Sequence, residues 1–309
     1  MVTIVIPAYN AAEYIDECIK SVCEQTFSSW RLLVVNDGST DDTQKKLAKW
    51  AALDTRVNYI TQKNSGVSGA RNRALSLIDT PYVLMLDADD TLEVNAVEKL
   101  VECMQSDESM DLVTSGFCEV SPLTGKRESR GGLLMGRKDE GVFSVENGFL
   151  AEYLHCSIWG KLMKMEIIRQ HGINFNADLR IGEDHLFSLQ YLLHCRKVFV
   201  LHDELYNYVQ WDSSAISSFD SARLPFDCYI KAVTIYSDFS RILPAPLRKS
   251  WSTALLSHFL RMRKWVKRIF SEHRAKAWKL LRKRINVHAM KLFWRAGIVN
   301  SLMMIRRWI

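Results

Sequence analysis

Two carboxylates two residues apart, Asp87 and Asp89, directly follow an apolar run at residues 82–86. Carboxylate oxygens are the ligands that Mg²⁺ and Mn²⁺ prefer, and one or two carboxylates usually suffice when phosphate oxygens and water complete the shell. The pair therefore indicates a divalent metal beside a phosphate group. Asp90 could instead cap a helix that begins near Leu92, so the pair alone leaves a solvated helix start as the alternative.

A second acidic pair, Glu183 and Asp184, lies within residues 180–185. A carboxylate that acts as general base must lie within hydrogen-bonding distance of the hydroxyl group that it activates. Upstream, Trp159 and Lys161 place an aromatic ring and a cation on a tight turn. The acidic pair is thus a candidate for acid–base chemistry, and a helix N-cap is its structural alternative.

Three further side chains are candidates for nucleotide binding. Asp37 follows the apolar run 32–35, where a carboxylate can accept a hydrogen bond from a base N–H or a ribose hydroxyl. Tyr9, at the end of the first apolar run, offers a face on which a base can stack. Arg71 lies in a glycine-rich helix start at residues 66–72, which by itself is weak evidence for phosphate binding.

The elements that must position these residues alternate between strands and helices. Short β-branched apolar runs lie at residues 2–6, 32–35, 57–60 and 82–86. Helical patterns separate them near 11–25, 41–52, 68–78 and 92–105. This alternation predicts an α/β domain whose mostly parallel central sheet is flanked by helices. Such sheets bind ligands beyond the carboxyl ends of their strands, where Tyr9, Asp37 and Asp87 fall.

The second half of the chain is less regular. Residues 119–142 predict an irregular excursion, because glycines alternate there with charged residues. Further helices are expected at 144–155, 162–171 and 183–194, and one more strand at 197–201. From about residue 224 the pattern is helical only, which predicts an all-helical C-terminal appendage.

Composition narrows the class of protein. Hydrophobic residues make up 48% and charged residues 25% of the chain, which excludes disordered and fibrous classes. The seven cysteines are scattered without a CxxC pair, so we expect reduced thiols rather than a disulfide framework or a zinc site. No run reaches the roughly 18 apolar residues of a membrane span, so no spanning helix is expected.

The positive charge is concentrated at the C-terminus. Residues 241–309 carry 18 Lys and Arg against one acidic residue, Glu272, so the overall charge of +6 leaves about −11 for residues 1–240. Five tryptophans interleave with these cations between Trp251 and Trp308. A basic amphipathic helix with tryptophan at its boundary predicts attachment to an anionic membrane surface through residues 245–309. A helical bundle packed on the preceding domain is the alternative, and nucleic-acid binding is disfavoured.

Taken together, six motifs resemble the family 2 inverting glycosyltransferases with the GT-A fold. They are VTIVIPAYNAAEYIDECI, VVNDGSTDDT, NSGVSGARNRAL, VLMLDADD, SIWGKLMKMEII and IGEDHLF. The resemblance covers residues 1–210 and follows the order and spacing of the family's motifs. It implies a catalytic domain at 1–223, with a nucleotide-sugar-binding half at 1–118 and an acceptor-binding half at 119–223. A basic, tryptophan-rich membrane-associating region would follow at 224–309.

The resemblance also implies roles for the residues that bind the nucleotide. Pro7, Ala8 and Tyr9 match the strand end that holds the nucleobase and ribose. Asp37 matches the acid that binds uracil, and Arg71 matches an arginine that contacts the base. Asn36 departs from the family's usual Asp at that position, which weakens the expectation for that position only.

The remaining roles concern the metal, the sugar and the proton. Asp87 and Asp89 match the DxD motif that holds ribose and the metal-bound diphosphate, with Asp89 as the metal ligand. Asp184 matches the catalytic base. The positions that face the donor sugar or the acceptor match Trp159, Lys161 and Glu183.

The resemblance implies a metal-assisted single displacement, in which Asp184 deprotonates an acceptor hydroxyl as the nucleoside diphosphate leaves. We expect a nucleotide-sugar donor, most simply a UDP-sugar, with Mn²⁺ or Mg²⁺ as cofactor. The acceptor would be a glycan or lipid-linked molecule in bacterial lipopolysaccharide, O-antigen or capsule synthesis, at the cytoplasmic face of the membrane. Nucleotidyl transfer and a non-catalytic, membrane-associated binding protein are the alternatives. The first would require a basic glycine-rich loop near residues 8–11, which are Ala-Tyr-Asn-Ala.

Overall fold

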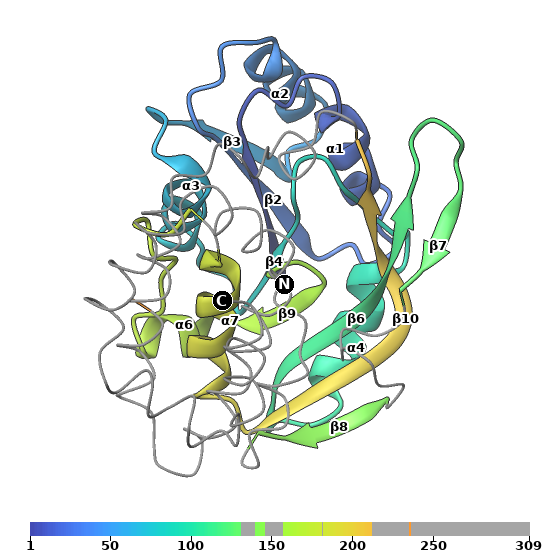
Figure 1. Cartoon of the computed structure of the whole chain (residues 1–309), viewed down its shortest axis with the longest axis vertical. Coiled ribbons are helices and arrows are strands. Elements are labelled where there is room, and N and C mark those ends of the chain that lie inside the picture. Colours follow the sequence, from blue (N-terminus) through green and yellow to red (C-terminus); the bar gives the residue numbers. More distant parts are fainter. Residues whose placement is uncertain (131–139, 146–156, 181, 212–234, 236–309) are drawn as a thin grey trace, which may run out of the picture.

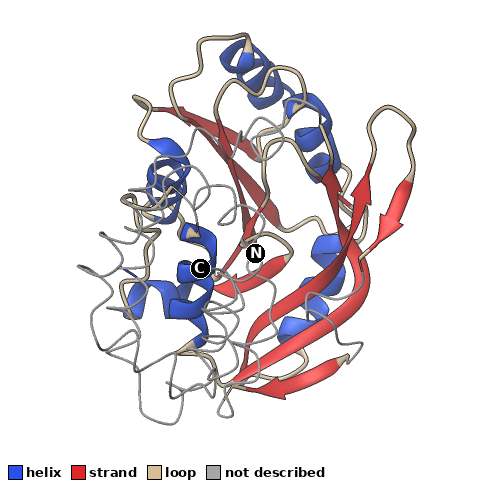
Figure 2. Ribbon diagram, viewed as in Figure 1, coloured by secondary structure: helices blue, strands red, loops and turns tan. Residues whose placement is uncertain are grey.

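The computed structural model describes residues 1–130, 140–145, 157–180, 182–211 and 235 (Figure 1). Within this part of the chain, helices pack against one large sheet (Figure 2). Apart from Ile235, the predicted C-terminal helices, and with them the boundary between 1–223 and 224–309, lie outside the described residues. None of the helices in the described part has the length and hydropathy that a membrane span requires.

Four parallel strands form the first half of the sheet. They are β1 (Val2–Ala8), β2 (Trp30–Asn36), β3 (Val57–Thr61) and β4 (Tyr82–Met85). All four match predicted strands. The register pairs Ala8 with Asn36 and Val5 with Met85, so the carboxyl ends of β1, β2 and β4 lie at the same edge. Apart from the partly buried Pro7 and Leu33, the apolar residues of β1 and β2 are buried, as expected for strands that are covered on both faces.

Three helices connect these strands: α1 (Ile15–Cys23), α2 (Thr43–Leu53) and α3 (Gly66–Leu75). Helix α1 buries Ile15, Cys18, Ile19 and Val22, the i, i+3, i+4 and i+7 positions of one helical face. Helix α3 lies on the opposite side of the parallel strands from α1 and α2 (Figure 1). This side follows from right-handed crossovers, because β4 pairs with β1 on the edge that β2 leaves open.

The second half mixes strand directions. Its elements are β5 (Thr91–Leu92), α4 (Ala96–Gln105), β6 (Met110–Val120), β7 (Arg127–Ser129), β8 (Gly141–Ser144), β9 (Lys161–Lys164), α6 (Met165–Gln170), α7 (Glu183–Leu192) and β10 (Lys197–Val209). The strand order is β3-β2-β1-β4-β9-β6-β10-β5, with β7 on β6 and β8 on β10. Strand β9 is antiparallel to both β4 and β6, whereas β6 and β10 are parallel. The sheet is therefore parallel across its first four strands and mixed beyond them.

Several boundaries differ from the sequence prediction. Residues 162–164 form β9 rather than a helix, because they are needed to join β4 to β6, and α6 begins only at Met165. Strand β6 was not predicted, and the excursion at 119–142 contains β7 and the start of β8. The expected strand at 197–201 extends to Val209. Of the helix expected at 144–155, Ser144 belongs to β8, and residues 146–156 lie outside the described part.

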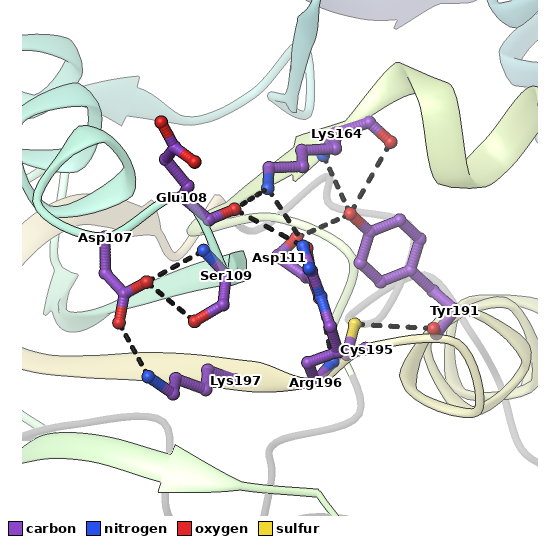
Figure 3. A network of polar contacts seen from close by, with 9 residues as sticks. All are labelled: Asp107, Glu108, Ser109, Asp111, Lys164, Tyr191, Cys195, Arg196 and Lys197. Atoms are coloured by element: carbon purple, nitrogen blue, oxygen red, sulfur yellow. Dashed lines mark hydrogen bonds and ion pairs between the residues drawn. The ribbon is translucent and has the colours of Figure 1, made fainter.

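A buried carboxylate near the start of β6, Asp111, connects several elements of the second half of the sheet. Asp111 is 2% exposed and accepts hydrogen bonds from Lys164 Nζ at 3.0 Å and from the guanidinium of Arg196 at 2.9 Å (Figure 3). The Tyr191 hydroxyl donates to its backbone carbonyl at 2.6 Å. Burial alone would raise the pKa of Asp111, but the bonds from Arg196 and Lys164 lower it. The network therefore links β6, β9 and α7 with the start of β10.

Replacing this carboxylate should destabilise the fold. Asp111→Asn is expected to reduce the free energy of unfolding by about 2–3 kcal/mol, since the lost bonds involve charged partners. A carboxyl with a lowered pKa in the folded state stabilises above its unfolded pKa, and this contribution disappears as the pH falls. The difference in free energy of unfolding between Asp111→Asn and the unmodified protein should therefore shrink in acid. Urea denaturation at neutral and acidic pH measures it.

Asp107→Asn is the matched control, because Asp107 pairs with Lys197 at the surface and such pairs contribute at most about 1 kcal/mol. An equal loss of stability in the two variants would contradict the role assigned to Asp111.

Candidate functional site

Polar residues collect where the parallel strands end. The Asp37 amide donates to the Ala8 carbonyl at 2.8 Å, which holds the end of β2 against the end of β1. Asn10 has a left-handed φ of 49° and links the two loops. Its backbone amide donates to Ser39 Oγ, and its side-chain Oδ1 accepts from the backbone amide of Thr40. Tyr9, between these contacts, is 51% exposed. Its ring is accessible at the strand ends, as the sequence predicts.

Asp37 lies beneath this surface and caps helix α3. Its Oδ1 accepts hydrogen bonds from the Ser65 amide at 2.9 Å and from Gln62 Nε2 at 2.8 Å, and its Oδ2 accepts from the Gly66 amide at 2.8 Å. The first amides of a helix have no partner within the helix, and a negative charge at this end is favourable. Asp37 is buried, so its carboxylate anchors α3 to the end of β2.

Asn36, which replaces the family's usual acid, has a local role. Its Oδ1 accepts from the Ser39 amide at 3.0 Å and so closes the turn that follows β2. An amide oxygen makes this bond without adding another negative charge beside Asp37. The substitution is therefore compatible with the loop that the motif forms.

Helix α3 carries Arg71, whose guanidinium joins both acidic motifs. One terminal nitrogen donates to Asp184 Oδ1 at 2.5 Å, and the other donates to Asp87 Oδ1 at 2.8 Å. Glu183 lies 3.8 Å from the first of these nitrogens. The Arg71 side chain is only 4% exposed, whereas that of Asp184 is 25% exposed. The structure thus brings together two motifs that are about a hundred residues apart.

The charges in this cluster shift one another. Burial by itself would lower the pKa of Arg71, but Asp184, Asp87 and Glu183 raise it above its usual value, so this residue stays a cation. Burial raises the pKa of Asp184 and of Glu183, and the charge of Arg71 partly offsets both shifts. A carboxylate that has a raised pKa and is held by one cation is suited to receiving a proton near neutral pH.

The DxD segment is held from the other side by β10. The Asp89 backbone carbonyl accepts from Trp211 Nε1 at 2.8 Å, and the Asp87 amide donates to the Tyr206 hydroxyl at 3.3 Å. Burial, followed by the charge of Asp87, raises the pKa of Asp89 to about 6. In the described part of the chain, no three His, Cys, Asp or Glu side chains are grouped closely enough to hold a metal by themselves.

Asp90 does not cap the following helix. It is 1% exposed, and its carboxylate accepts from the Tyr206 hydroxyl at 2.5 Å and from the Val209 amide at 2.8 Å. Helix α4 begins later, after Asn95. Asp90 therefore fastens the DxD loop to β10, a role that sequence reasoning missed because β10 is more than a hundred residues away.

Trp159 and Lys161 lie deeper than a surface turn would place them. Trp159 bridges to Met85 at the end of β4 and stacks on Tyr206 with ring centroids 4.4 Å apart. The Lys161 side chain is buried and donates to the Ser157 carbonyl. The charge of Lys161 also acts on Asp184, where it favours the carboxylate form. Both residues thus belong to the wall behind the acidic cluster.

The chain is similar in sequence to known proteins. The model of the family "Glycosyl transferase family 2" matches residues 3–161. GlyA, a glycosyltransferase of Streptococcus pneumoniae, is 29% identical over 67% of this chain and 30% of its own length. The teichoic acid poly(glycerol phosphate) polymerase of Staphylococcus epidermidis is 31% identical over 63% of this chain and 26% of its own length. The chain therefore spans about a third or less of these two relatives.

The fold has a counterpart among solved structures. Residues 1–349 of TarS from S. aureus, in complex with UDP-GlcNAc, superpose with a TM-score of 0.63 at 18% identity. The match covers 96% of this chain and 92% of that one. This likeness concerns the fold, which is the GT-A fold. The family model covers half of the chain and includes the strand ends, Arg71 and the DxD motif. The chain is a member of glycosyl transferase family 2.

Proposed function

We propose that this protein transfers a sugar from a nucleotide-diphosphate donor to an acceptor hydroxyl in the synthesis of a bacterial surface polysaccharide. The observation that carries the proposal is the ion-paired cluster at the strand ends. Arg71 holds Asp184 beside Asp87, and the exposed Tyr9 follows β1, the strand that pairs with β4. If Asp184 is the base and the DxD loop receives the diphosphate, this contact would keep the two close together, as transfer to a hydroxyl requires. The relatives named for glycosyl transfer and teichoic acid synthesis support the polymer class.

The donor would lie across the carboxyl ends of β1, β2 and β4. Tyr9 offers a stacking face for the base, beside Pro7, Ala8 and the loop that Asp37 supports. The DxD loop would receive the ribose and the diphosphate. A UDP-sugar is the donor class that we propose, in line with the bound UDP-GlcNAc of TarS.

The chemistry follows from the position of Asp184. One of its oxygens is occupied by Arg71, and the partly exposed carboxylate retains an oxygen that can accept the proton of an acceptor hydroxyl. The hydroxyl oxygen forms the new bond to the anomeric carbon as the bond to the diphosphate breaks. A single displacement of this kind inverts the anomeric configuration. Trp159, Lys161 and Glu183 would line the sugar and acceptor side.

The residues at the DxD loop fit a divalent cation. Asp89 is a partly buried carboxylate close enough to Asp87 for the two charges to repel, and a cation relieves that repulsion. Asp89 would be the protein ligand and Asp87 its neighbour, with donor oxygens completing the shell, as Mg²⁺ and Mn²⁺ prefer. When bound, the cation would neutralise charge on the departing diphosphate.

A donor screen tests the proposed function. The full chain is incubated with UDP-, GDP- and dTDP-sugars and Mn²⁺, and release of the nucleoside diphosphate is measured with and without glycan or lipid-linked acceptors. We expect one nucleotide-sugar class to be consumed, and more quickly with its acceptor. Release of pyrophosphate from a nucleoside triphosphate and a sugar phosphate would favour nucleotidyl transfer instead. Failure to bind or consume any nucleotide sugar would contradict the proposal.

We further propose that residues 245–309 attach the protein to the cytoplasmic face of the membrane, near a lipid-linked acceptor. Their cations and tryptophans support this proposal, since each cation close to an anionic surface contributes about 1 kcal/mol. Sedimentation of the full chain with vesicles containing phosphatidylglycerol should show enrichment over phosphatidylcholine vesicles, and the enrichment should weaken with added salt. Equal sedimentation with both vesicles at low salt would favour a region packed on the catalytic domain.

A further inference from the structure

We propose that Arg71 is a positioning residue and does not contact the nucleobase. Together with Asn72, it sets the position of the Asp184 carboxylate relative to the nucleotide-sugar-binding half, residues 1–118. The inference rests on the proposed function, because it assigns how the base of that reaction is held. It differs from the role that the family resemblance implies for Arg71, which is contact with the base.

The guanidinium of Arg71 forms a fork between two carboxylates. Its two terminal nitrogens are fixed in one plane, and each donates to a different carboxylate, Asp184 at 2.5 Å and Asp87 at 2.8 Å. A rigid planar group that bonds two acids fixes the distance between them. Asp87 belongs to the DxD loop and Asp184 to the first turn of α7, so Arg71 sets one motif against the other. Each terminal nitrogen already donates to a carboxylate and the side chain is only 4% exposed, so the group is poorly placed to contact a base.

Asn72, the next residue on the same helix, holds the segment that precedes α7. Asn72 pairs with the backbone of Phe175 in both directions, donating to its carbonyl at 2.8 Å and accepting from its amide at 2.7 Å. The Phe175 ring stacks on Phe187 of α7 with centroids 4.1 Å apart, and Arg71 lies over the same ring at 5.2 Å. Two consecutive residues of α3 therefore hold both the segment before α7 and its first turn.

Helix α3 is itself anchored to the end of β2. Asp37 at the end of β2 accepts from the Ser65 and Gly66 amides, the first amides of the helix. Helix α3 also lies beside α7 in the fold, across the parallel strands from α1 and α2 (Figure 1). A continuous set of contacts thus runs from β2 through α3 to Asp184, and Arg71 is its last member.

A lysine cannot reproduce this arrangement. It keeps the positive charge among three carboxylates, so the fold should survive, but it is a point charge without a planar fork. Arg71→Lys should therefore leave Asp184 misplaced. Misplacement by about 1 Å can lower turnover by about 100-fold. We expect Arg71→Lys to lower kcat by about 10- to 100-fold.

The decisive comparison separates turnover from base binding. The affinity for UMP is measured by calorimetry without a divalent cation. If Arg71 acts only through Asp184, this affinity should change by less than about 2-fold in Arg71→Lys. The loss of one contact to the base would instead weaken it by about 10-fold. Arg73→Lys is the matched control, because Arg73 lies on the exposed face of the same helix, and it should change neither quantity. A loss of UMP affinity in Arg71→Lys as large as the loss in kcat would overturn the inference in favour of base contact.

A double-variant cycle tests whether Arg71 acts through Asp184. Once Asp184→Asn has removed the base, adding Arg71→Lys should lower kcat little further. The urea midpoints of the same variants provide a readout that needs no turnover, and they should also be non-additive, because the two groups are in contact. Additive effects on both quantities would overturn the inference. A protein that consumes no nucleotide sugar, yet shows the coupled midpoints, would contradict the proposed function and leave the positioning contact in place.

Discussion

The Asp184→Asn variant is expected to transfer sugar at least about 100-fold more slowly than the unmodified protein. Asparagine preserves the size of the side chain but cannot take up the proton of the acceptor hydroxyl. The donor should bind with nearly unchanged affinity, because the proposed donor contacts lie at the strand ends of β1, β2 and β4. Steady-state kinetics with the acceptor, together with calorimetric titration of UDP, measure the two quantities separately.

The fold should tolerate this change. Burial raises the pKa of Asp184, so the ionised side chain carries a cost that asparagine avoids, and Arg71 retains Asp87 and Glu183 as partners. Asp79→Asn, which alters an exposed surface pair with Arg31, serves as the control and should behave as the unmodified protein does. Near-normal turnover in Asp184→Asn would transfer the role of base to Glu183.

Removing the carboxylate of Asp89 should abolish the dependence on a divalent cation. Asp89→Ala is expected to lower kcat/KM by about 100- to 1000-fold, because a cation held there would supply several kcal/mol of charge stabilisation to the departing diphosphate. Its backbone carbonyl, which accepts from Trp211, is retained, so the loop should remain attached to β10. The affinity for Mn²⁺ in the presence of UDP, measured by calorimetry, should fall together with kcat/KM.

The matched control is Asp203→Ala, which removes a half-exposed carboxylate that pairs with Lys99. It should leave both turnover and Mn²⁺ binding unchanged. Full activity of the unmodified protein in excess chelator would contradict the assignment of Asp89 as a metal ligand.

The first half of the fold could be predicted because its signals are local. The apolar runs of β1 and β2 and the regular spacing of Ile15, Cys18, Ile19 and Val22 identify a buried strand or a helical face without reference to the rest of the chain. In β6, by contrast, Asp111, Thr114 and Ser115 are buried polar residues, which obscure the strand pattern. Their burial depends on partners such as Arg196, which no local pattern indicates.

The candidate site likewise combines residues that local sequence signals indicate with contacts between distant segments that they do not. Residue types and strand ends indicated Asp87, Asp89 and Asp184 as candidates, yet Arg71 joins Asp87 to Asp184 through a contact that spans 113 residues from Arg71 to Asp184. The anchoring roles of Asp90 and Tyr206 depend on β10, whose full length the sequence did not reveal. Spacing along the chain identifies the reactive groups, whereas the side chains that hold them become evident only when the strands are assembled.

The stereochemistry of the transferred sugar tests the central claim most directly, because a single displacement assisted by Asp184 has only one outcome. Early product formed from an α-linked nucleotide sugar is examined by proton NMR, and the coupling constant at the anomeric proton reports its configuration. Inversion to the β-linked product is the expected result, and it should be lost together with turnover in Asp184→Asn. An α-linked product formed at normal rate would contradict direct attack by the acceptor hydroxyl.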